Sequence, residues 1–525
     1  MKKNIRIQVA WQEYRETAVW RFLDRFIFPI AIYLLTAVAV ILNGSLIFDN
    51  VLWGDECFSA NTAQKSMGGI LQVLYYWDNH PPLHYYWTKL FGEVLGHTGW
   101  VYHLAALTPF LIGLVLALFF LQRHFEKIPV AFLIVITALS SACLHNNLEI
   151  RMYSLAFMGV LCSYYCAYRA ISGGKAAAWI GMVFWGLVGA YSHYYAMMTA
   201  GILIFVTGVA AIIRFRRKTW IKSFAALLGY IVGYAPWFRY LFHGTNNVKN
   251  NWWMTELMGV KDSAKMILCG PEYAKILFFL LLICLGVLFL AESSLFEVTY
   301  DDGKQLEVMV HTPTLKKWSN HTYGAAIGVV TILGTVIAVY LVCLVVGPVL
   351  TGRYLYPVSA LSVLLVVIAS DGMLKVVKKR DRKQHVQWPE NLVKLGLVLV
   401  LTVLTVIGLR SYKEYRTEAL HEKAVTEQTL EIIGEVDKDT AMVSNNVKHL
   451  AWTVLYYYYP DREIIAGRCS NEGADYNKFW YFTPEPIDVD ELQEMKDMGY
   501  SVEYCGDQQI AMYPFTLYYC EKAGR

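Results

Sequence analysis

Long apolar runs separated by short polar segments dominate the pattern along this chain. A run of roughly 20 apolar residues is long enough to cross a bilayer. Such runs occur at 28–48, 101–121, 128–147, 152–171, 177–193, 195–213, 221–242, 274–292, 324–346, 354–370 and 393–409. The pattern therefore predicts a polytopic α-helical membrane protein with about eleven transmembrane helices. The apolar stretch 83–95 is shorter and contains charged residues, so we expect it at the membrane surface or only partly inserted.

Composition supports this class. The chain is 56% hydrophobic and 17% charged, with a mean hydropathy of +0.37. This apolar content is higher than that of a soluble domain. The net charge is +4, and the sequence contains neither a basic tail nor a basic aromatic groove. We therefore expect no nucleic-acid partner. A long polar segment precedes the first apolar run and no small-residue cleavage site follows it, which predicts a retained anchor.

The distribution of basic clusters predicts the orientation. Short cytoplasmic loops hold most Lys and Arg residues in membrane proteins. With a cytoplasmic amino terminus, the clusters at 123–127, 175, 214–218 and 375–383 all fall inside. The same parity gathers several stretches on the outer face: 49–99, 145–151, 191–195, 243–272, 347–354 and the tail after 410.

Two domains are expected. Residues 1–410 form the membrane domain, with 49–99 as its first outer loop, and residues 411–525 form a small extracytoplasmic α/β domain. In the tail, the pattern of residues predicts a helix at 413–435, a short strand beginning at Thr440, and two paired strands around Gly506-Asp507. Cys505 and Cys520 flank that hairpin and could form a disulfide in an oxidising compartment, which would leave Cys469 over.

An inner loop at 293–322 alternates polar and apolar residues around Asp301-Asp302-Gly303, which predicts a small hairpin.

An adjacent pair of carboxylates, Asp55 and Glu56, follows the first apolar run. A carboxylate can act as a general base, which accepts the proton of an attacking acceptor group. The alternative is that both acids are solvated interfacial residues, with Trp53 as an aromatic anchor before them.

A rigid turn is expected at His80-Pro81-Pro82, because each proline fixes φ and restricts the residue before it. The turn either directs His80 toward the carboxylate pair or a phosphate, or simply starts a helix with His80 exposed.

Two arginines are candidates for binding an anion. Arg353 lies in an apolar stretch between Gly and Pro residues, where a charge is costly unless it faces a polar cavity or an anion. Arg151 either binds a phosphate or extends to the interface and pairs with Glu149. Residues 193–195, at the next outer junction, fit an ordinary interfacial aromatic belt, which is the favoured interpretation for Tyr195.

These motifs together resemble the GT-C superfamily of polyprenyl-phosphate-sugar glycosyltransferases. The likeness is greatest to the bacterial branch that includes protein O-mannosyltransferases and the aminoarabinose transferases of lipid A. It covers roughly residues 28–410, through the Asp-Glu pair at 55–56, the PPL turn at 81–83, the Arg-x-Tyr-Ser-Leu motif at 151–155, the His-Tyr pair at 193–194 and the Arg-Tyr-Leu-x-Pro motif at 353–357.

The resemblance implies roles for individual residues. Asp55 would be the general base, with Glu56 as its partner. Arg353, Arg151 and His80 would bind the donor phosphate, although the aminoarabinose branch has Lys where this chain has His80. The substrate cavity would be lined by Trp53, Tyr153, His193, Tyr194 and Tyr354.

The resemblance implies an integral membrane glycosyltransferase of the bacterial cytoplasmic membrane. It would transfer a hexosyl or pentosyl group, with inversion, from a polyprenyl-phosphate donor within membrane lipid to an extracytoplasmic acceptor that is a protein, glycan or lipid. No residue cluster requires a metal; a divalent cation is left open as a cofactor. The alternatives are a transporter or flippase of a lipid-linked saccharide, and a non-catalytic scaffold.

Overall fold

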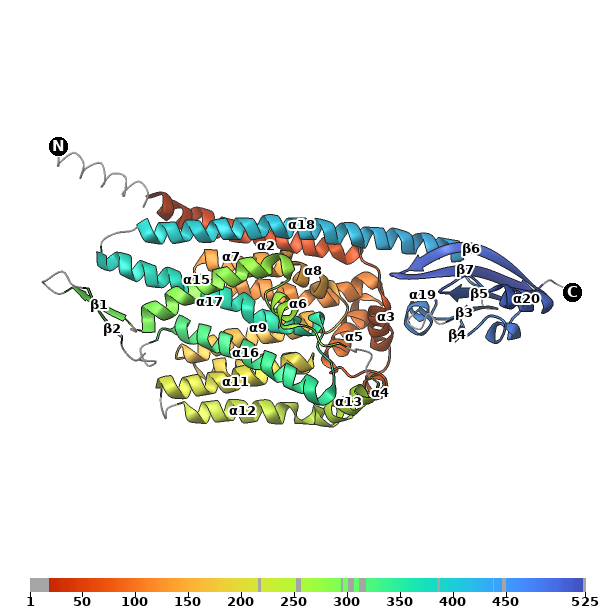
Figure 1. The fold of residues 1–525 in the computed structure, drawn as a ribbon, viewed down its shortest axis with the longest axis horizontal. Coiled ribbons are helices and arrows are strands. Elements are labelled where there is room, and N and C mark those ends of the chain that lie inside the picture. The colour runs from red at the N-terminus through yellow and green to blue at the C-terminus, as the bar shows by residue number, and fades with distance from the viewer. Residues whose placement is uncertain are drawn as a thin grey trace.

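The protein consists of a large helical domain and a small sheet domain, as the computed structural model shows (Figure 1). The structure describes residues 18–215, 219–251, 256–293, 296–300, 306–310, 318–384, 388–437, 439–445 and 450–522. The helices of the first half are α2 (Phe28–Ser45), α3 (Gly54–Ala63), α4 (Met67–Tyr76), α5 (Leu83–Leu95), α6 (Gly99–Phe119), α7 (Lys127–Leu139), α8 (Ser141–Leu148), α9 (Tyr153–Ile171), α10 (Ala176–Ala190) and α11 (Tyr194–Phe215). Then follow α12 (Trp220–Tyr234), α13 (Phe238–Asn251), α14 (Val260–Ile267), α15 (Pro271–Ser293), α16 (Asn320–Val346), α17 (Gly352–Gln384) and α18 (Trp388–Ile433).

The chain is a multi-pass membrane protein. Among the described residues, seven helices are long and apolar enough to cross a bilayer, and the bent pair α7 and α8, which meet at 63°, would make eight. The predicted count of eleven is not confirmed. Three predicted spans correspond to α9, α10 and α12, which are too short or too polar to pass the same test.

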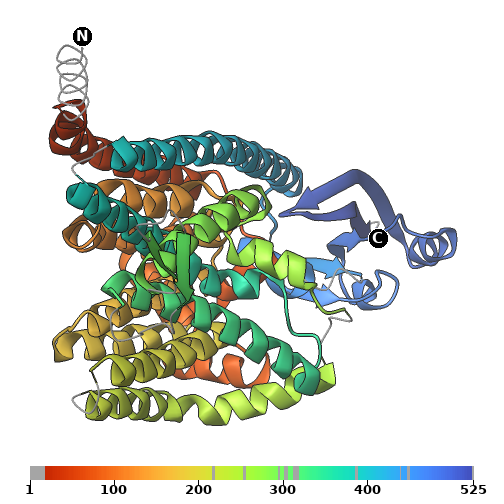
Figure 2. The same cartoon turned by 60° about the vertical axis from the view of Figure 1, so that its left-hand side comes forward.

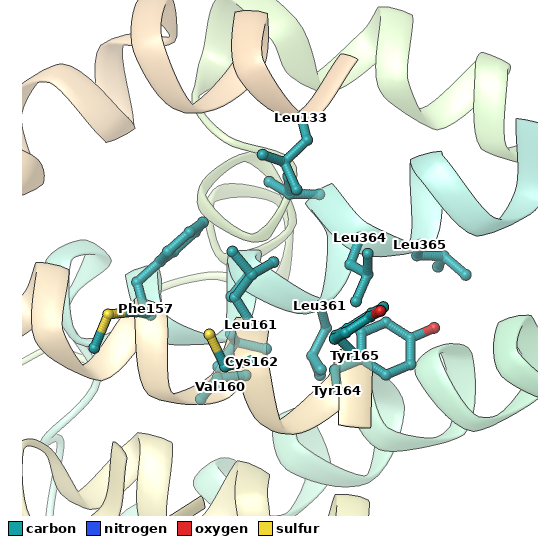
Figure 3. Packing of buried hydrophobic residues seen from close by; sticks show 14 of the residues in the cluster. Leu133, Phe157, Val160, Leu161, Cys162, Tyr164, Tyr165, Leu361, Leu364 and Leu365 are labelled. Atoms are coloured by element: carbon teal, nitrogen blue, oxygen red, sulfur yellow. The ribbon is translucent and has the colours of Figure 1, made fainter. Parts of the chain in front are cut away.

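The centre of the helical domain is tightly packed around α9 and α17. Figure 3 shows Leu161 and Tyr164 of α9 near Leu361 of α17. The ring of Phe157 stacks on that of Tyr356 at 4.9 Å. On the other side of α9, a Cβ at Gly159 would lie only 2.5 Å from the backbone nitrogen of Gly189, so glycine allows α9 and α10 to approach closely.

The sheet domain follows α18. Its five strands are β3 (Thr440–Ser444), β4 (Ile464–Ala466), β5 (Lys478–Thr483), β6 (Tyr500–Ile510) and β7 (Tyr513–Lys522), in the order β4-β3-β5-β7-β6. β3 pairs in parallel with β4 and β5, and the other pairs are antiparallel. Two short helices, α19 (Leu455–Tyr458) and α20 (Val489–Asp497), accompany the sheet.

The two ends of the helical domain carry different structures. The sheet domain lies at the end where α3, α4 and α5 are found, and the predicted outer stretches meet there (Figure 1). The opposite end carries the antiparallel pair β1 (Phe296–Tyr300) and β2 (Leu306–Val310), seen at the front in Figure 2. This confirms the predicted hairpin; its expected turn at Asp301-Asp302-Gly303 lies outside the described residues.

Three details of the tail differ from expectation. α18 is one helix of 46 residues that includes both the predicted span and the predicted helix after it. The hairpin turn lies at Ala511 and Met512, both with left-handed φ, whereas Gly506 takes φ 98° where the β6–β7 register shifts. Cys505 and Cys520 are not bridged; both are free thiols.

Candidate active site

A cavity of about 750 Å³ opens at the end of the helical domain nearest the sheet domain. Five separate segments of the chain contribute to its wall, because the predicted outer stretches converge there. The polar and aromatic residues of the wall are Trp53, Asp55, Trp77, Asp78, Asn79, His80, Arg151, His193, Tyr194, Tyr195, Thr245, Arg353 and Tyr354.

Asp55 and Arg353 form the central ion pair of this cavity. Asp55 lies in the first turn of α3, where the helix dipole favours a carboxylate. Its Oδ2 is 3.2 Å from Nη1 of Arg353, which begins α17. The guanidinium also lies 3.5 Å from Oε1 of Glu149 and over the ring of Trp53, at 5.5 Å. With side-chain exposures of 24% and 30%, Asp55 and Arg353 are both accessible from the cavity.

Glu56 does not face the same cavity. Its Oε2 accepts a hydrogen bond from the backbone N–H of Trp53 at 3.2 Å, and its Oε1 accepts one from Ile150 at 2.8 Å. Glu56 therefore caps α3 and joins it to the segment before α9. Burial raises the pKa of Glu56 to about 8, although the two backbone donors lower it.

The turn before α5 holds a second carboxylate, Asp78. Its Oδ1 lies 2.7 Å from Nδ1 of His80 and accepts a bond from the Asn79 N–H at 2.8 Å, while the Tyr85 hydroxyl donates to Oδ2. Burial raises the pKa of Asp78, but His80, Arg151 and Tyr85 more than offset it, so the pKa lies well below its usual range. Asp78 therefore holds His80 in place at the cavity wall.

Both expectations for the His80-Pro81-Pro82 turn are realised in part. α5 does begin directly after Pro82, and the N–H of Leu83 donates to the carbonyl of Tyr191 at 3.0 Å. The His80 side chain is however only 13% exposed, since it turns toward Asp78 and the cavity.

Arg151 is buried in the cavity wall and does not extend to the surface. It is 5% exposed, and its Nη1 donates weakly to Ser59 at 3.3 Å and to Tyr85 at 3.4 Å. Its Nε has no hydrogen-bond partner among the described residues. A buried guanidinium with spare donors can bind an incoming anion.

A cluster of aromatic side chains closes the far wall. His193, Tyr194 and Tyr354 line the cavity, and the His193 ring lies 5.1 Å from that of Tyr354 and 6.1 Å from that of His80. Nδ1 of His193 accepts from the Tyr195 N–H at 3.1 Å, which leaves the ring proton on Nε2 as a donor. Tyr153 lies behind this layer, fully buried against His193 and Tyr354.

The remaining wall is apolar. It is formed by Met197, Met198, Leu241, Phe242, Val342, Val346 and Val349. Phe242 is 67% exposed and Trp77 is 82% exposed, so this side of the cavity presents apolar surface outward. The cavity thus combines a charged floor with an apolar side.

Asp78 and Tyr85 were not among the predicted site residues, although both contact residues of the cavity wall. Asp78 lies two residues before His80, so a carboxylate next to a His-Pro-Pro turn was the available signal. Glu149 was considered only as a local partner of Arg151. No group of three or more His, Cys, Asp or Glu residues with metal-binding geometry occurs within the described part of the chain.

Comparisons with known proteins identify the fold. No family model and no curated protein sequence matches the chain. Two crystal structures of ArnT from Cupriavidus metallidurans match at 12% identity, covering 93% of this chain and 97% of that one. The apo structure gives a TM-score of 0.56, and the structure bound to undecaprenyl phosphate gives 0.55. These likenesses confirm the expected fold: the chain has the fold of ArnT.

Proposed function

We propose that this protein is an integral membrane glycosyltransferase. It takes a sugar from a polyprenyl-phosphate donor and passes it to an acceptor on the extracytoplasmic side of the cell membrane, with the amino terminus in the cytoplasm. The observation that carries the proposal is the Asp55–Arg353 pair, 3.2 Å apart, at a cavity with one charged and one apolar side.

The shape of the cavity suits such a donor. The apolar side formed by residues such as Leu241, Phe242 and Val346 faces outward and would receive the polyprenyl chain. The charged floor would receive the phosphate and sugar. ArnT from Cupriavidus metallidurans, whose fold this chain shares over 93% of its length, has been crystallised with undecaprenyl phosphate. That likeness supports a polyprenyl phosphate as the lipid partner.

The chemistry follows from the placement of the charges. Asp55 accepts the proton of the acceptor nucleophile as that group forms a bond to the anomeric carbon. The bond between this carbon and the phosphate oxygen breaks, and its electron pair stays on the departing polyprenyl phosphate. Arg353 and Arg151 stabilise the charge that develops there. His193, as a neutral Nε2–H donor, and His80, held by Asp78, complete the polar wall.

A direct displacement of this kind inverts the anomeric carbon. The donor's phosphate and the acceptor would then lie on opposite sides of the sugar. Glu56 has no direct role in this scheme, because both its oxygens accept backbone hydrogen bonds away from Asp55.

The test is a transfer assay on purified protein in lipid, with a panel of radiolabelled undecaprenyl-phosphate hexoses and pentoses and a membrane extract as acceptor. We expect one donor to release polyprenyl phosphate as labelled product forms, with the opposite anomeric configuration. In sealed vesicles, a donor that instead crosses to the other leaflet with its glycosyl phosphate bond intact would contradict the proposal and indicate a flippase.

A further inference from the structure

The carboxylates that line the 750 Å³ cavity already have partners within the protein. Asp55 and Asp78 are the only acidic residues among its described lining residues. Asp78 accepts hydrogen bonds from His80 at 2.7 Å and from the Asn79 N–H at 2.8 Å, and a tyrosine hydroxyl on α5 donates to its other oxygen. Asp55 lies 3.2 Å from Arg353, and in the proposed reaction it must stay available for the proton of the acceptor. The wall therefore has no carboxylate left to pair with a positive charge on a sugar.

The positive charges of the same wall are committed in a similar way. Arg151 and Arg353 are the only Lys or Arg side chains among the described residues that line the cavity. In the proposed function both of them bind the phosphate of the donor, so neither is left for a carboxylate on the sugar. A charge that is buried without a partner is costly. A sugar with an ammonium or a carboxylate group is therefore disfavoured once the phosphate is bound.

Neutral polar groups provide the remaining hydrogen-bonding capacity. His193 presents its Nε2–H as a donor, because its Nδ1 accepts from a backbone N–H. The Tyr194 hydroxyl accepts from Nε1 of Trp237 at 3.4 Å, so its own proton can be donated. The Thr245 hydroxyl donates to the carbonyl of Leu241 at 2.8 Å, which leaves its lone pairs to accept. Sugar hydroxyls both donate and accept, and they match these groups without adding charge.

Asn79 contributes a neutral group that can both donate and accept. Its backbone N–H is bound to Asp78, whereas its side-chain amide makes no hydrogen bond within the described part of the chain and lines the cavity. A Cβ at Gly244 of α13 would lie 3.1 Å from Oδ1 of Asn79, so the glycine leaves room for the amide between α13 and the turn before α5. A free amide offers two donors and one acceptor oxygen.

Taking the proposed function as given, we propose that the donor carries an uncharged sugar and that Asn79 is the residue that selects it. The amide binds a sugar hydroxyl, so a hexose or pentose that has only hydroxyl substituents satisfies the wall. An amino sugar would have to take Asp55 from Arg353. A uronic acid would compete with the donor's own phosphate for the two arginines.

The test is displacement of radiolabelled undecaprenyl phosphate from the purified full-length protein in lipid. The competitors are undecaprenyl phosphates that carry glucose, galactose or arabinose, their amino-sugar counterparts, and the glucuronic and galacturonic acid derivatives. We expect the best neutral competitor to bind at least about tenfold tighter than the best charged one, equivalent to about 1.4 kcal/mol. A charged competitor that binds as tightly as the best neutral one would overturn the proposal. Failure of every neutral competitor, in protein that binds undecaprenyl phosphate, would also overturn it.

The variant Asn79→Asp tests whether this residue makes the selection, because it replaces the amide with a carboxylate of nearly the same shape. The best amino sugar should gain at least about fivefold in affinity relative to the best neutral sugar, since the new charge attracts the ammonium group. Uronic acids should bind more weakly than they do to the wild type. Binding of unmodified undecaprenyl phosphate reports that the variant is folded.

The matched control is Gln72→Glu, which adds the same charge at an exposed position of α4 outside the cavity lining. It should leave the order of the competitors unchanged. The same unchanged order in Asn79→Asp would exclude Asn79 as the selecting residue.

Failure of the proposed function gives a different result. If the wild type does not bind undecaprenyl phosphate at all, the donor assignment is wrong, and this is seen before any sugar is compared. A preference for charged sugars in protein that binds undecaprenyl phosphate would leave the proposed function intact and overturn only the choice of an uncharged sugar.

Discussion

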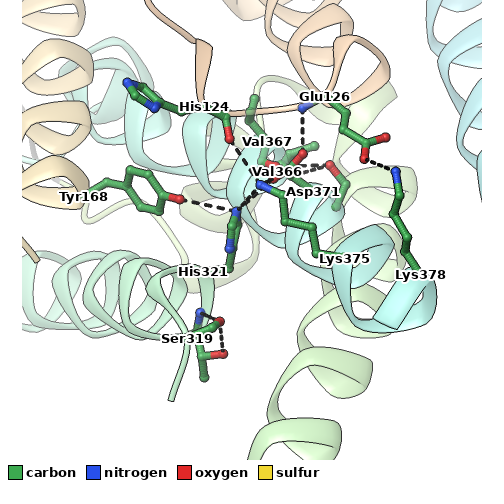
Figure 4. A network of polar contacts seen from close by, with 12 residues as sticks. His124, Glu126, Tyr168, Ser319, His321, Val366, Val367, Asp371, Lys375 and Lys378 are labelled. Atoms are coloured by element: carbon green, nitrogen blue, oxygen red, sulfur yellow. Dashed lines mark hydrogen bonds and ion pairs between the residues drawn. The ribbon is translucent and has the colours of Figure 1, made fainter. Parts of the chain in front are cut away.

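Two polar clusters lie at opposite ends of the helical domain, and each pairs an aspartate with a basic side chain. Figure 4 shows the cluster away from the sheet domain, where Asp371 accepts from the Glu126 N–H at 2.7 Å and lies 2.8 Å from His321 and 2.6 Å from Lys375. At the other end, Asp55 contacts Arg353 at 3.2 Å beside a large cavity.

The difference lies in how completely the charges are satisfied. The Asp371 side chain is fully buried. Its partners come from the residue that precedes α7, from α16 and from α17, so the cluster connects these three helices. At the other end Asp55 and Arg353 stay accessible, and Arg151 keeps an unused donor. Charges inside a membrane protein therefore indicate a reactive site only where they border a cavity with spare hydrogen-bonding capacity.

The largest effect is expected from Arg353→Met. This change removes the charge that would stabilise the departing phosphate, so transfer should fall by about a hundredfold or more. Arg353→Lys should recover part of the rate, because it restores the charge without the planar fork. The matched control is Arg410→Met, whose exposed partner Glu414 lies one turn away. Equal transfer rates for the Arg353→Met and Arg410→Met variants would show that Arg353 has no special role in transfer.

The opposite cluster should respond through stability. Asp371→Ala leaves His321 and Lys375 without their buried carboxylate, and breaking a buried pair costs about 3–5 kcal/mol. The apparent Tm should fall, while the transfer rate per folded molecule stays within about twofold. Asp262→Ala, which removes an exposed pair with Lys265, is the control and should leave Tm unchanged. A normal Tm combined with lost catalysis would show that the Asp371 cluster serves the reaction.

A smaller effect is expected at Asp78. Asp78→Asn keeps the shape of the side chain but removes the charge that holds His80 and faces Arg151. The donor KM should rise about tenfold with a smaller change in kcat, because the change disturbs phosphate binding more than proton transfer. A loss confined to kcat would instead place Asp78 among the reacting groups.

The smallest effect concerns pH and Glu56. Its pKa rises from 4.5 to about 8 in the folded chain, so the folded state retains a proton that the unfolded state has lost. Stability should therefore decrease as the pH rises between about 4.5 and 8. Glu149, whose pKa burial raises to about 7, acts in the same direction. Glu56→Gln should flatten the dependence of apparent Tm on pH, and an unchanged slope would contradict the assignment of Glu56 as a protonated cap.

The membrane class could be predicted from the sequence, because it depends on local patterns of apolar residues. Several predicted residues, among them Asp55, Arg151 and Arg353, line the cavity at the sheet-domain end, whereas Glu56 and Tyr153 do not. A charged residue that interrupts an apolar run, such as Arg353, can be recognised from the sequence alone. The pairing of Asp78 with Tyr85 and Arg151 was not visible, because it depends on how α5 and α9 pack together.

The course of the tail was also not predicted. The composition changes near residue 410, but no Gly or Pro interrupts the chain between Gly408 and Gly434, so α18 continues across the change. Gly506 suggested a turn, but it lies within β6, where the pairing register with β7 shifts. The turn itself lies at Ala511 and Met512 and contains no glycine that would identify it in the sequence.

The most direct test of the proposed active site is a comparison of the wild type with Asp55→Asn for both donor binding and transfer. Asn keeps the size of the side chain but cannot take the proton, so transfer should fall at least about a hundredfold, while undecaprenyl phosphate binds with an affinity within a few-fold of the wild type. Transfer that continues at the wild-type rate in Asp55→Asn would show that another group accepts the proton and would contradict the proposed mechanism.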